Sequence, residues 1–298
     1  DVPNGSIFGL PTLNHGQGEH LLRLCWGHFA FTLSGIGTES FIEIPVYLDN
    51  ATTQGWVQYD RPASPEGLES LVLACPEDNL VLGALYDDTG FLAGLQYAVS
   101  IDLLEDPAYD WASLGYTEWD VTLTNGTSQS FWTHQLYLVS AETLATDAET
   151  RIASRDSTTI LQDTDIWITD NDGELRNIST NTEYITAAGS PYTEQACIPW
   201  MGHHYYYNMS ASLECSAKTI SSWFPLLYSD RIIGVGHMMW AKYEGKKQYF
   251  EEPTQSDVKM IVPNGSECFY ELAKTPGVLT SHIYFVNPAT TITCLFED

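Results

Sequence analysis

Three pairs of segments recur in the same order along this 298-residue chain, and they constrain its fold more than any other feature. The first pair is 24–31 and 197–207, and each member carries a cysteine and a Gly-His step. The second pair is 82–97 and 224–238, and the third is 134–139 and 281–286. Three collinear matches predict a tandem duplication, in which two related domains follow each other along the chain.

Short runs of β-branched and aromatic residues, separated by turn signals, dominate the sequence. Their period-two alternation, clear over 41–47, is typical of strands with one buried face. One helix is predicted over 140–154, with Ser140 as its N-cap. Strands are expected over 26–33, 41–48, 55–59, 68–74, 80–86, 91–101, 118–123, 131–139, 165–169, 202–207, 224–228, 232–243, 258–262 and 281–287.

These elements predict a mostly β protein made of two related antiparallel β-sandwich or open-barrel domains, joined by one short linking helix. An N-terminal arm is expected over 1–20, because that stretch is rich in Gly, Pro and Asn. The first β repeat would cover 21–155 and be the degenerate copy. The second would cover 156–298 and carry the candidate site.

The charge balance excludes two classes of partner. There are 39 acidic and 12 basic residues, which give a net charge of −27. Such a field repels phosphate backbones and anionic lipids, so neither nucleic acid nor a membrane surface is an expected partner. No apolar run is long enough to span a bilayer. The expected partner is a small molecule or a metal ion, and the oligomeric state is left open.

Cysteines and glycosylation motifs both indicate a secreted, extracellular protein. Six cysteines form an even set without a C-x-x-C pair, which favours disulfides. The repeat suggests the pairs Cys25–Cys75 and Cys197–Cys215, which leaves Cys268–Cys294. The chain begins at Asp1 without an apolar leader, so we expect a mature product. Six Asn-x-Ser/Thr motifs predict glycosylation at Asn4, Asn50, Asn125, Asn177, Asn208 and Asn264.

Histidines supply the candidate chemistry. When one half is laid on the other, His203 falls on His28, His237 on Gln96 and His282 on Gln135. Imidazole is a good ligand for first-row metals and a glutamine amide is a poor one. We therefore expect a mononuclear zinc or copper site in the second half, able to activate water or a small molecule. The alternative for each histidine alone is a hydrogen-bonded core residue.

A short motif selects a different histidine. The stretch from Pro199 to Tyr205, Pro-Trp-Met-Gly-His-His-Tyr, resembles the Pro-x-Met-Gly-x-His-aromatic motif of a family of small uncharacterised bacterial domains. The resemblance implies that His204 is the important residue, and it implies no activity. Neighbours on a strand face opposite sides, so His203 and His204 cannot both point inward. Both stay candidates.

Other side chains could complete the site. Met201 and Met239 are possible soft ligands, which would favour copper, and Met238 lies beside them in the sequence. Glu251, Glu252 and Asp257 are candidate acceptors for the second imidazole nitrogen.

No catalytic residue can be named from the sequence. The chain has no G-x-S-x-G, H-E-x-x-H or P-loop motif, so it gives no support to serine hydrolase, zincin or nucleotide chemistry. The alternative function is a non-enzymatic extracellular carrier. Its aromatic-lined pocket would hold a small hydrophobic ligand, a pigment or a glycan.

Overall fold

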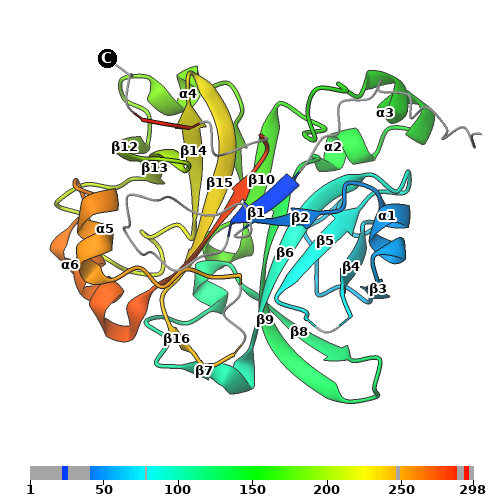
Figure 1. The fold of residues 1–298 in the computed structure, drawn as a ribbon, viewed down its shortest axis with the longest axis horizontal. Helices are drawn as coiled ribbons and strands as arrows, with labels where there is room; N and C mark the ends of the chain where they lie inside the picture. Colours follow the sequence, from blue (N-terminus) through cyan, green and yellow to red (C-terminus); the bar gives the residue numbers. More distant parts are fainter. Residues whose placement is uncertain (1–21, 26–40, 78, 246–248, 287–291, 295–298) are drawn as a thin grey trace, which may run out of the picture.

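The computed structural model describes residues 22–25, 41–77, 79–245, 249–286 and 292–294. It confirms a mostly β protein in which the paired strands are antiparallel. Two large sheets lie side by side (Figure 1). The predicted strand over 26–33 and the N-terminal arm lie outside the described residues.

The first sheet contains eight strands, with β8 (Thr117–Thr122) paired to β9 outside the main path. The main path runs β11 (Leu175–Ser179), β10 (Asp165–Thr169), β9 (Ser128–Tyr137), β6 (Leu92–Ser100), β5 (Leu82–Tyr86), β4 (Val72–Pro76) and β3 (Trp56–Tyr59).

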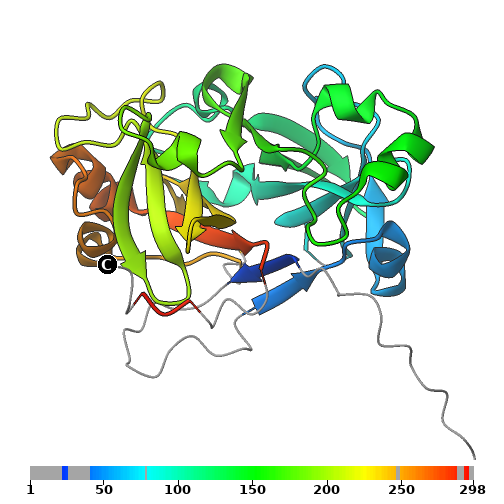
Figure 2. The same ribbon diagram turned by 90° about the horizontal axis from the view of Figure 1, so that it is seen from above.

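The second sheet contains seven strands and takes its last two from the start of the chain. Its path runs β12 (Tyr192–Ile198), β13 (Gly202–Tyr207), β14 (Trp223–Tyr228), β15 (Arg231–Met239), β17 (Leu279–Tyr284), β1 (Leu22–Cys25) and β2 (Phe41–Ile44). Figure 2 shows β1 and β2, in blue, at the inner end of this sheet. The sheets therefore do not divide the chain at residue 155, since β10 and β11 complete the first sheet and β1 and β2 the second.

The strand orders of the two sheets correspond. In the first sheet the β5–β6 hairpin is followed by β9 and β10, and in the second the β14–β15 hairpin is followed by β17 and β1. Gly94 pairs with Tyr137 in one sheet, and Gly234 pairs with Tyr284 in the other. In this register β1 corresponds to β10. The strand that corresponds to β4, which lies beside β5, is β13. The expected match of 24–31 with 197–207 lies largely outside the described residues.

Three hydrophobic clusters hold the layers together. The largest lies between the sheets and includes Leu95 of β6 with Val235 and Ile283 of the second sheet. Another covers the outer face of the second sheet, where Val258 and Phe269 belong to helices. The third covers the outer face of the first sheet.

The helices differ from the prediction. The expected helix over 140–154 is two short helices, because Ser140 and Asp147 each cap a new start. The expected strand over 258–262 is wrong, because it lies largely in a helix that Thr254 and Asp257 begin with a capping box. The apolar residues of this segment are spaced at i, i+3 and i+4, which is the sequence signal for a helix. The α-helices are α1 (Leu48–Thr53), α2 (Ala141–Leu144), α3 (Ala148–Ser154), α4 (Glu183–Thr186), α5 (Gln255–Ile261) and α6 (Glu267–Leu272).

Shorter elements complete the fold. Single turns of 3-10 helix are η2 (Ile101–Leu103), η3 (Ala112–Leu114) and η4 (Asn171–Gly173), and η5 (Ala273–Gly277) is a π-helical turn after α6. The strands β7 (Leu104–Glu105) and β16 (Lys242–Tyr243) form a small separate ribbon. No helix in the described part of the chain is both long and apolar enough to cross a membrane.

Two disulfides are present, but their pairing differs from the prediction. Cys197 bonds to Cys294, and Cys215 bonds to Cys268. Cys75 is a buried free thiol, so the expected bond to Cys25 is absent. The prediction failed because it rested on the match between segments 24–31 and 197–207, which the sheet topology does not support.

Candidate functional site

Two histidines from different strands meet on the outer face of the second sheet. His204 lies on β13 and His282 on β17, and β14 and β15 run between them. On this face β15 presents Gly234 and Gly236, so no β15 side chain separates the two imidazoles. A Cβ added to Gly236 would lie 2.0 Å from the Phe224 ring. The Gly-x-Gly step therefore makes the meeting possible.

The two imidazoles face each other through the same nitrogen. Nε2 of His204 is 3.4 Å from Nε2 of His282. Nδ1 of His204 lies 3.3 Å from the carbonyl oxygen of Ala196 and 3.2 Å from that of Gly202. A carbonyl only accepts hydrogen bonds, so the proton of neutral His204 belongs on Nδ1. Its Nε2 then points a lone pair at His282.

A buried carboxylate lies beside His282, whose Nδ1 makes no hydrogen bond within the described part of the chain. Its Nδ1 is 3.5 Å from Oε2 of Glu251, which is 1% exposed. Backbone hydrogen bonds in both directions tie Glu251 to Thr280, two residues from His282 on β17. A carboxylate behind a histidine favours a proton on Nδ1, which leaves Nε2 free. Of the three acceptors considered from the sequence, Glu251 is the one beside a buried histidine, whereas Asp257 caps α5 and Glu252 is exposed.

A small cavity adjoins the two imidazoles and separates them from helices α5 and α6. Its volume is about 20 Å³, which is room for one or two waters. The helices are the orange ribbons at the left of Figure 1. The lining residues are His204, Tyr206, Phe224, Met238, Trp240, Glu251, Pro253, Val258, Ile261, Val262, Phe269, Val278, Thr280 and His282.

Burial disfavours the charged forms of two side chains in this site, His204 and Tyr206. The pKa of His204 is lowered to about 3, first by burial and then by the neighbouring His282. Burial raises the pKa of the Tyr206 phenol, and the charge of Glu251 adds to that rise. His204 is therefore an uncharged imidazole at neutral pH, which is the form that binds metals.

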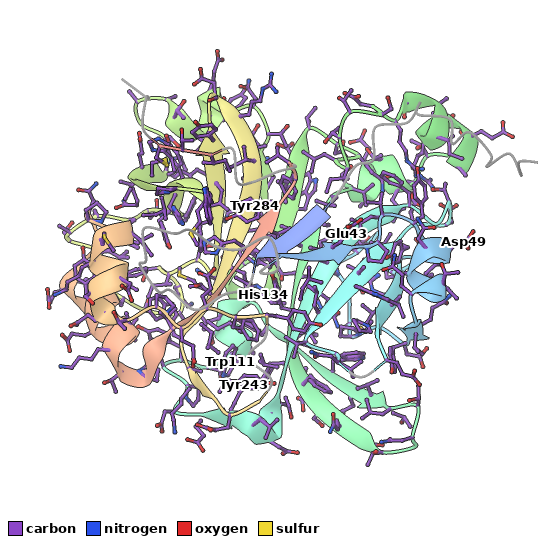
Figure 3. The ribbon with its side chains drawn as sticks, in the orientation of Figure 1. Glu43, Asp49, Trp111, His134, Tyr243 and Tyr284 are labelled. Carbon is purple, nitrogen blue, oxygen red and sulfur yellow. A yellow bond between two sulfur atoms is a disulfide. The ribbon has the colours of Figure 1, made fainter. Side chains whose placement is uncertain are left out.

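A second histidine pair lies in the core between the sheets. Nδ1 of His134 is 3.0 Å from Nε2 of His237, and Nε2 of His134 is 2.7 Å from the carbonyl oxygen of Thr169. Figure 3 shows His134 near the centre of the molecule. The His237 ring stacks on Tyr97 of the first sheet at 4.7 Å between centroids.

The structure separates the histidines that the sequence placed together. On β15 and β17, Gly236 is opposite His282 and His237 is opposite Ser281. Directly opposite residues share a face, so His237 and His282 point to opposite faces of the sheet. A site containing both is therefore wrong. In the first sheet, Tyr97 holds the position that corresponds to His237, and Gln135 holds the position that corresponds to His282.

The choice between His203 and His204 is also clear. His203 faces away from the pair, and its Nδ1 is 2.9 Å from Oε1 of the exposed Glu194. His204 is the buried residue of the two. Neither expected soft ligand reaches the cavity, since Met239 packs between the sheets and Met201 lies elsewhere in the outer cluster. Met238 lines it instead, because it lies on the same face as Gly236.

Comparison with known proteins yields no relative: no protein-family model matches the chain, and neither a curated protein nor a solved structure matches it. Within the described residues, no group of three or more His, Cys, Asp or Glu side chains is arranged to hold a metal ion. The candidate site is therefore a histidine pair with a carboxylate behind it, and its chemistry must be argued from its own geometry.

Proposed function

We propose that this protein binds one first-row metal ion, zinc or copper, between Nε2 of His204 and Nε2 of His282. The observation that carries the proposal is the 3.4 Å distance between these atoms. Two metal–nitrogen bonds of about 2.0–2.1 Å at a tetrahedral angle hold their nitrogens about 3.4 Å apart. The remaining coordination positions open toward the cavity, where a water or small molecule would be activated.

The hydrogen-bond pattern supports an ion at this point. A direct hydrogen bond between neutral imidazoles would need a proton on one Nε2. The Nδ1 of that ring would then turn a lone pair toward the carbonyls of Ala196 and Gly202 or toward the Glu251 carboxylate. Either contact is repulsive inside a low-dielectric core.

We also propose a secreted, glycosylated protein, neither nucleic-acid-binding nor membrane-bound. Two disulfides are typical of oxidising compartments. Each sequon asparagine in the described part of the chain is solvent-exposed, as an oligosaccharide requires; these are Asn50, Asn125, Asn177, Asn208 and Asn264. Asn4 lies outside the described residues.

A duplication remains our proposal for the origin of the two sheets. Their corresponding strand order supports it, and so do the stacked rings of Tyr97 and His237, which hold the same register position in the two sheets. At the metal position the first sheet has Leu73 in place of His204 and Gln135 in place of His282. The first sheet would thus be the degenerate copy, and each half would be completed by a hairpin from the other part of the chain.

The rival carrier function receives less support from the space available. Ligand pockets for drug-sized molecules usually measure about 300–1,000 Å³, far above the cavity beside His204. A groove of about 620 Å³ over β3, β4 and β8 is large enough, but its lining includes Arg61, Glu69 and Asp120. Such a lining does not suit an apolar pigment or lipid.

The proposal is tested by metal analysis of protein purified without chelators and then reloaded with zinc or copper. We expect about one equivalent in the wild type and less than a tenth of that in His204→Leu and His282→Gln. These variants install the residues that hold the corresponding positions of the first sheet.

The matched control is His203→Gln, which changes the adjacent histidine on the opposite face. It should retain the full equivalent. Equal metal content in all four proteins, or none in the wild type, would overturn the site.

A further inference from the structure

The charge of the cavity bears on which ion it would hold, an inference that rests on the proposed metal site. Among its lining residues, all in the described part of the chain, Glu251 is the sole carboxylate and there is no Lys or Arg. The two imidazoles are neutral ligands. A monovalent ion with one carboxylate leaves no net charge, whereas a divalent ion leaves one buried positive charge. Burying an unpaired charge is costly.

One soft donor lies in the cavity, together with the oxygen atoms of Glu251, Thr280 and Tyr206. Met238 lines the same cavity and follows Gly236 by two residues on the same face of β15. Thioethers and imidazoles suit monovalent copper, whereas zinc and divalent copper favour additional oxygen, nitrogen or thiolate ligands. No second carboxylate and no thiol lines the cavity to serve those ions.

The available space points the same way. Zinc bound by two protein ligands needs two more ligands to complete a tetrahedron. The cavity of about 20 Å³ holds one or two waters at most, among Phe224, Trp240, Val258 and Phe269. Monovalent copper accepts a lower coordination number, and two imidazoles with one thioether would supply three ligands and leave room for one small molecule.

We propose that the ion bound by His204, His282 and Met238 is monovalent copper, with Glu251 as its charge partner.

The test is a pair of competition titrations. Apo protein is titrated anaerobically with Cu(I) against a chromogenic Cu(I) chelator, and separately with Zn(II) against a chromogenic zinc chelator. We expect one Cu(I) bound at least 100-fold more tightly than Zn(II). Silver(I), a redox-inert monovalent probe, should compete for the same single site.

Two leucine variants separate the thioether from general packing. Met238→Leu should weaken Cu(I) binding at least tenfold and leave Zn(II) binding within threefold of the wild type. Met239→Leu, the neighbouring methionine on the opposite face, should change neither, and circular dichroism confirms that both variants fold. Tighter binding of Zn(II) than Cu(I), or equal Cu(I) binding by the two variants, would overturn the copper assignment while leaving a metal site. Binding of neither ion would overturn the proposed function itself.

Discussion

The two buried histidine pairs differ in what lies behind each ring. Nε2 of His134 lies 2.7 Å from the Thr169 carbonyl oxygen and 3.3 Å from Nε1 of Trp223, and its Nδ1 lies 3.0 Å from Nε2 of His237. His204 and His282 both have their Nδ1 atoms beside acceptors, and their Nε2 atoms face each other across 3.4 Å. The first pair forms a hydrogen-bonded chain that joins the sheets. The second presents two lone pairs to one point.

This contrast shows that residue type alone does not distinguish a core histidine from a ligand. All four rings are buried, and burial lowers the pKa of His134, His204 and His237. The acceptors on the far side of each ring determine the tautomer, and the tautomer determines whether a second histidine meets an N–H donor or a lone pair.

The largest expected effect is on the free energy of unfolding, which should respond differently to substitutions in the two histidine pairs. His237→Ala leaves a cavity beside Tyr97 and removes the partner of His134, so it should lower the free energy of unfolding by about 3 kcal/mol. Metal content should stay at one equivalent. His282→Gln in the metal-free protein should cost less than about 1 kcal/mol, because glutamine keeps polar contact with Glu251. Urea unfolding measures both, and metal loss in His237→Ala equal to that in His282→Gln would show that the pairs are not independent.

The next effect is on the pH dependence of stability. Burial lowers the pKa of His134 to about 4, although the Thr169 carbonyl and Asp170 act in the opposite direction. The unfolded residue has a pKa near 6.5. The unfolded chain binds more protons between these values, so stability is complete above about pH 6.5 and falls as the pH drops toward 4.

From pH 7 to pH 5 this residue should account for a loss of about 2 kcal/mol. His237 titrates in the same direction, so His134→Gln should make the slope shallower without abolishing it. Urea unfolding at pH 7, 6 and 5 gives the slopes. Identical slopes for the wild type and His134→Gln would contradict the assignment of His134 as a buried neutral residue.

The smallest effect concerns the histidine that faces solvent. His203 and Glu194 form a contact in which the side chains are 22% and 57% exposed. Solvent screens such pairs, so His203→Gln should change the free energy of unfolding by less than about 0.5 kcal/mol. A cost above about 2 kcal/mol in urea unfolding would show that His203, like His237, supports the core.

The expectations that held depended on local pattern. Period-two alternation correctly predicted most of the strands, and segments 82–97 and 224–238 each form a β-hairpin. The His282 position corresponds to Gln135, as the alignment implied, but His237 corresponds to Tyr97 and not to Gln96. The predicted alignment was therefore off by one residue at His237. Because successive side chains on a strand alternate between faces, this error placed His237 on the wrong face of the sheet.

The failures came from contacts between distant segments. The disulfide partners of Cys197 and Cys215 lie 97 and 53 residues away, and spacing alone allows many pairings. The helix after Thr254 is rich in β-branched residues, which are also common in strands. Composition therefore predicted a strand there, whereas the capping box is the local signal for a helix. The role of Met238 depended on the face of β15, which only the register reveals.

By itself, the sequence determined the antiparallel β class, the strongly acidic charge and the set of histidines from which a site could be built. Those properties follow from composition and from periods of a few residues. Only the tertiary structure decided that β1 and β2 complete the second sheet and that His204, not His237, meets His282. It did so because strand pairing and register are set by packing between segments up to about 260 residues apart, such as β1 and β17, and one residue of register reverses which face a side chain occupies.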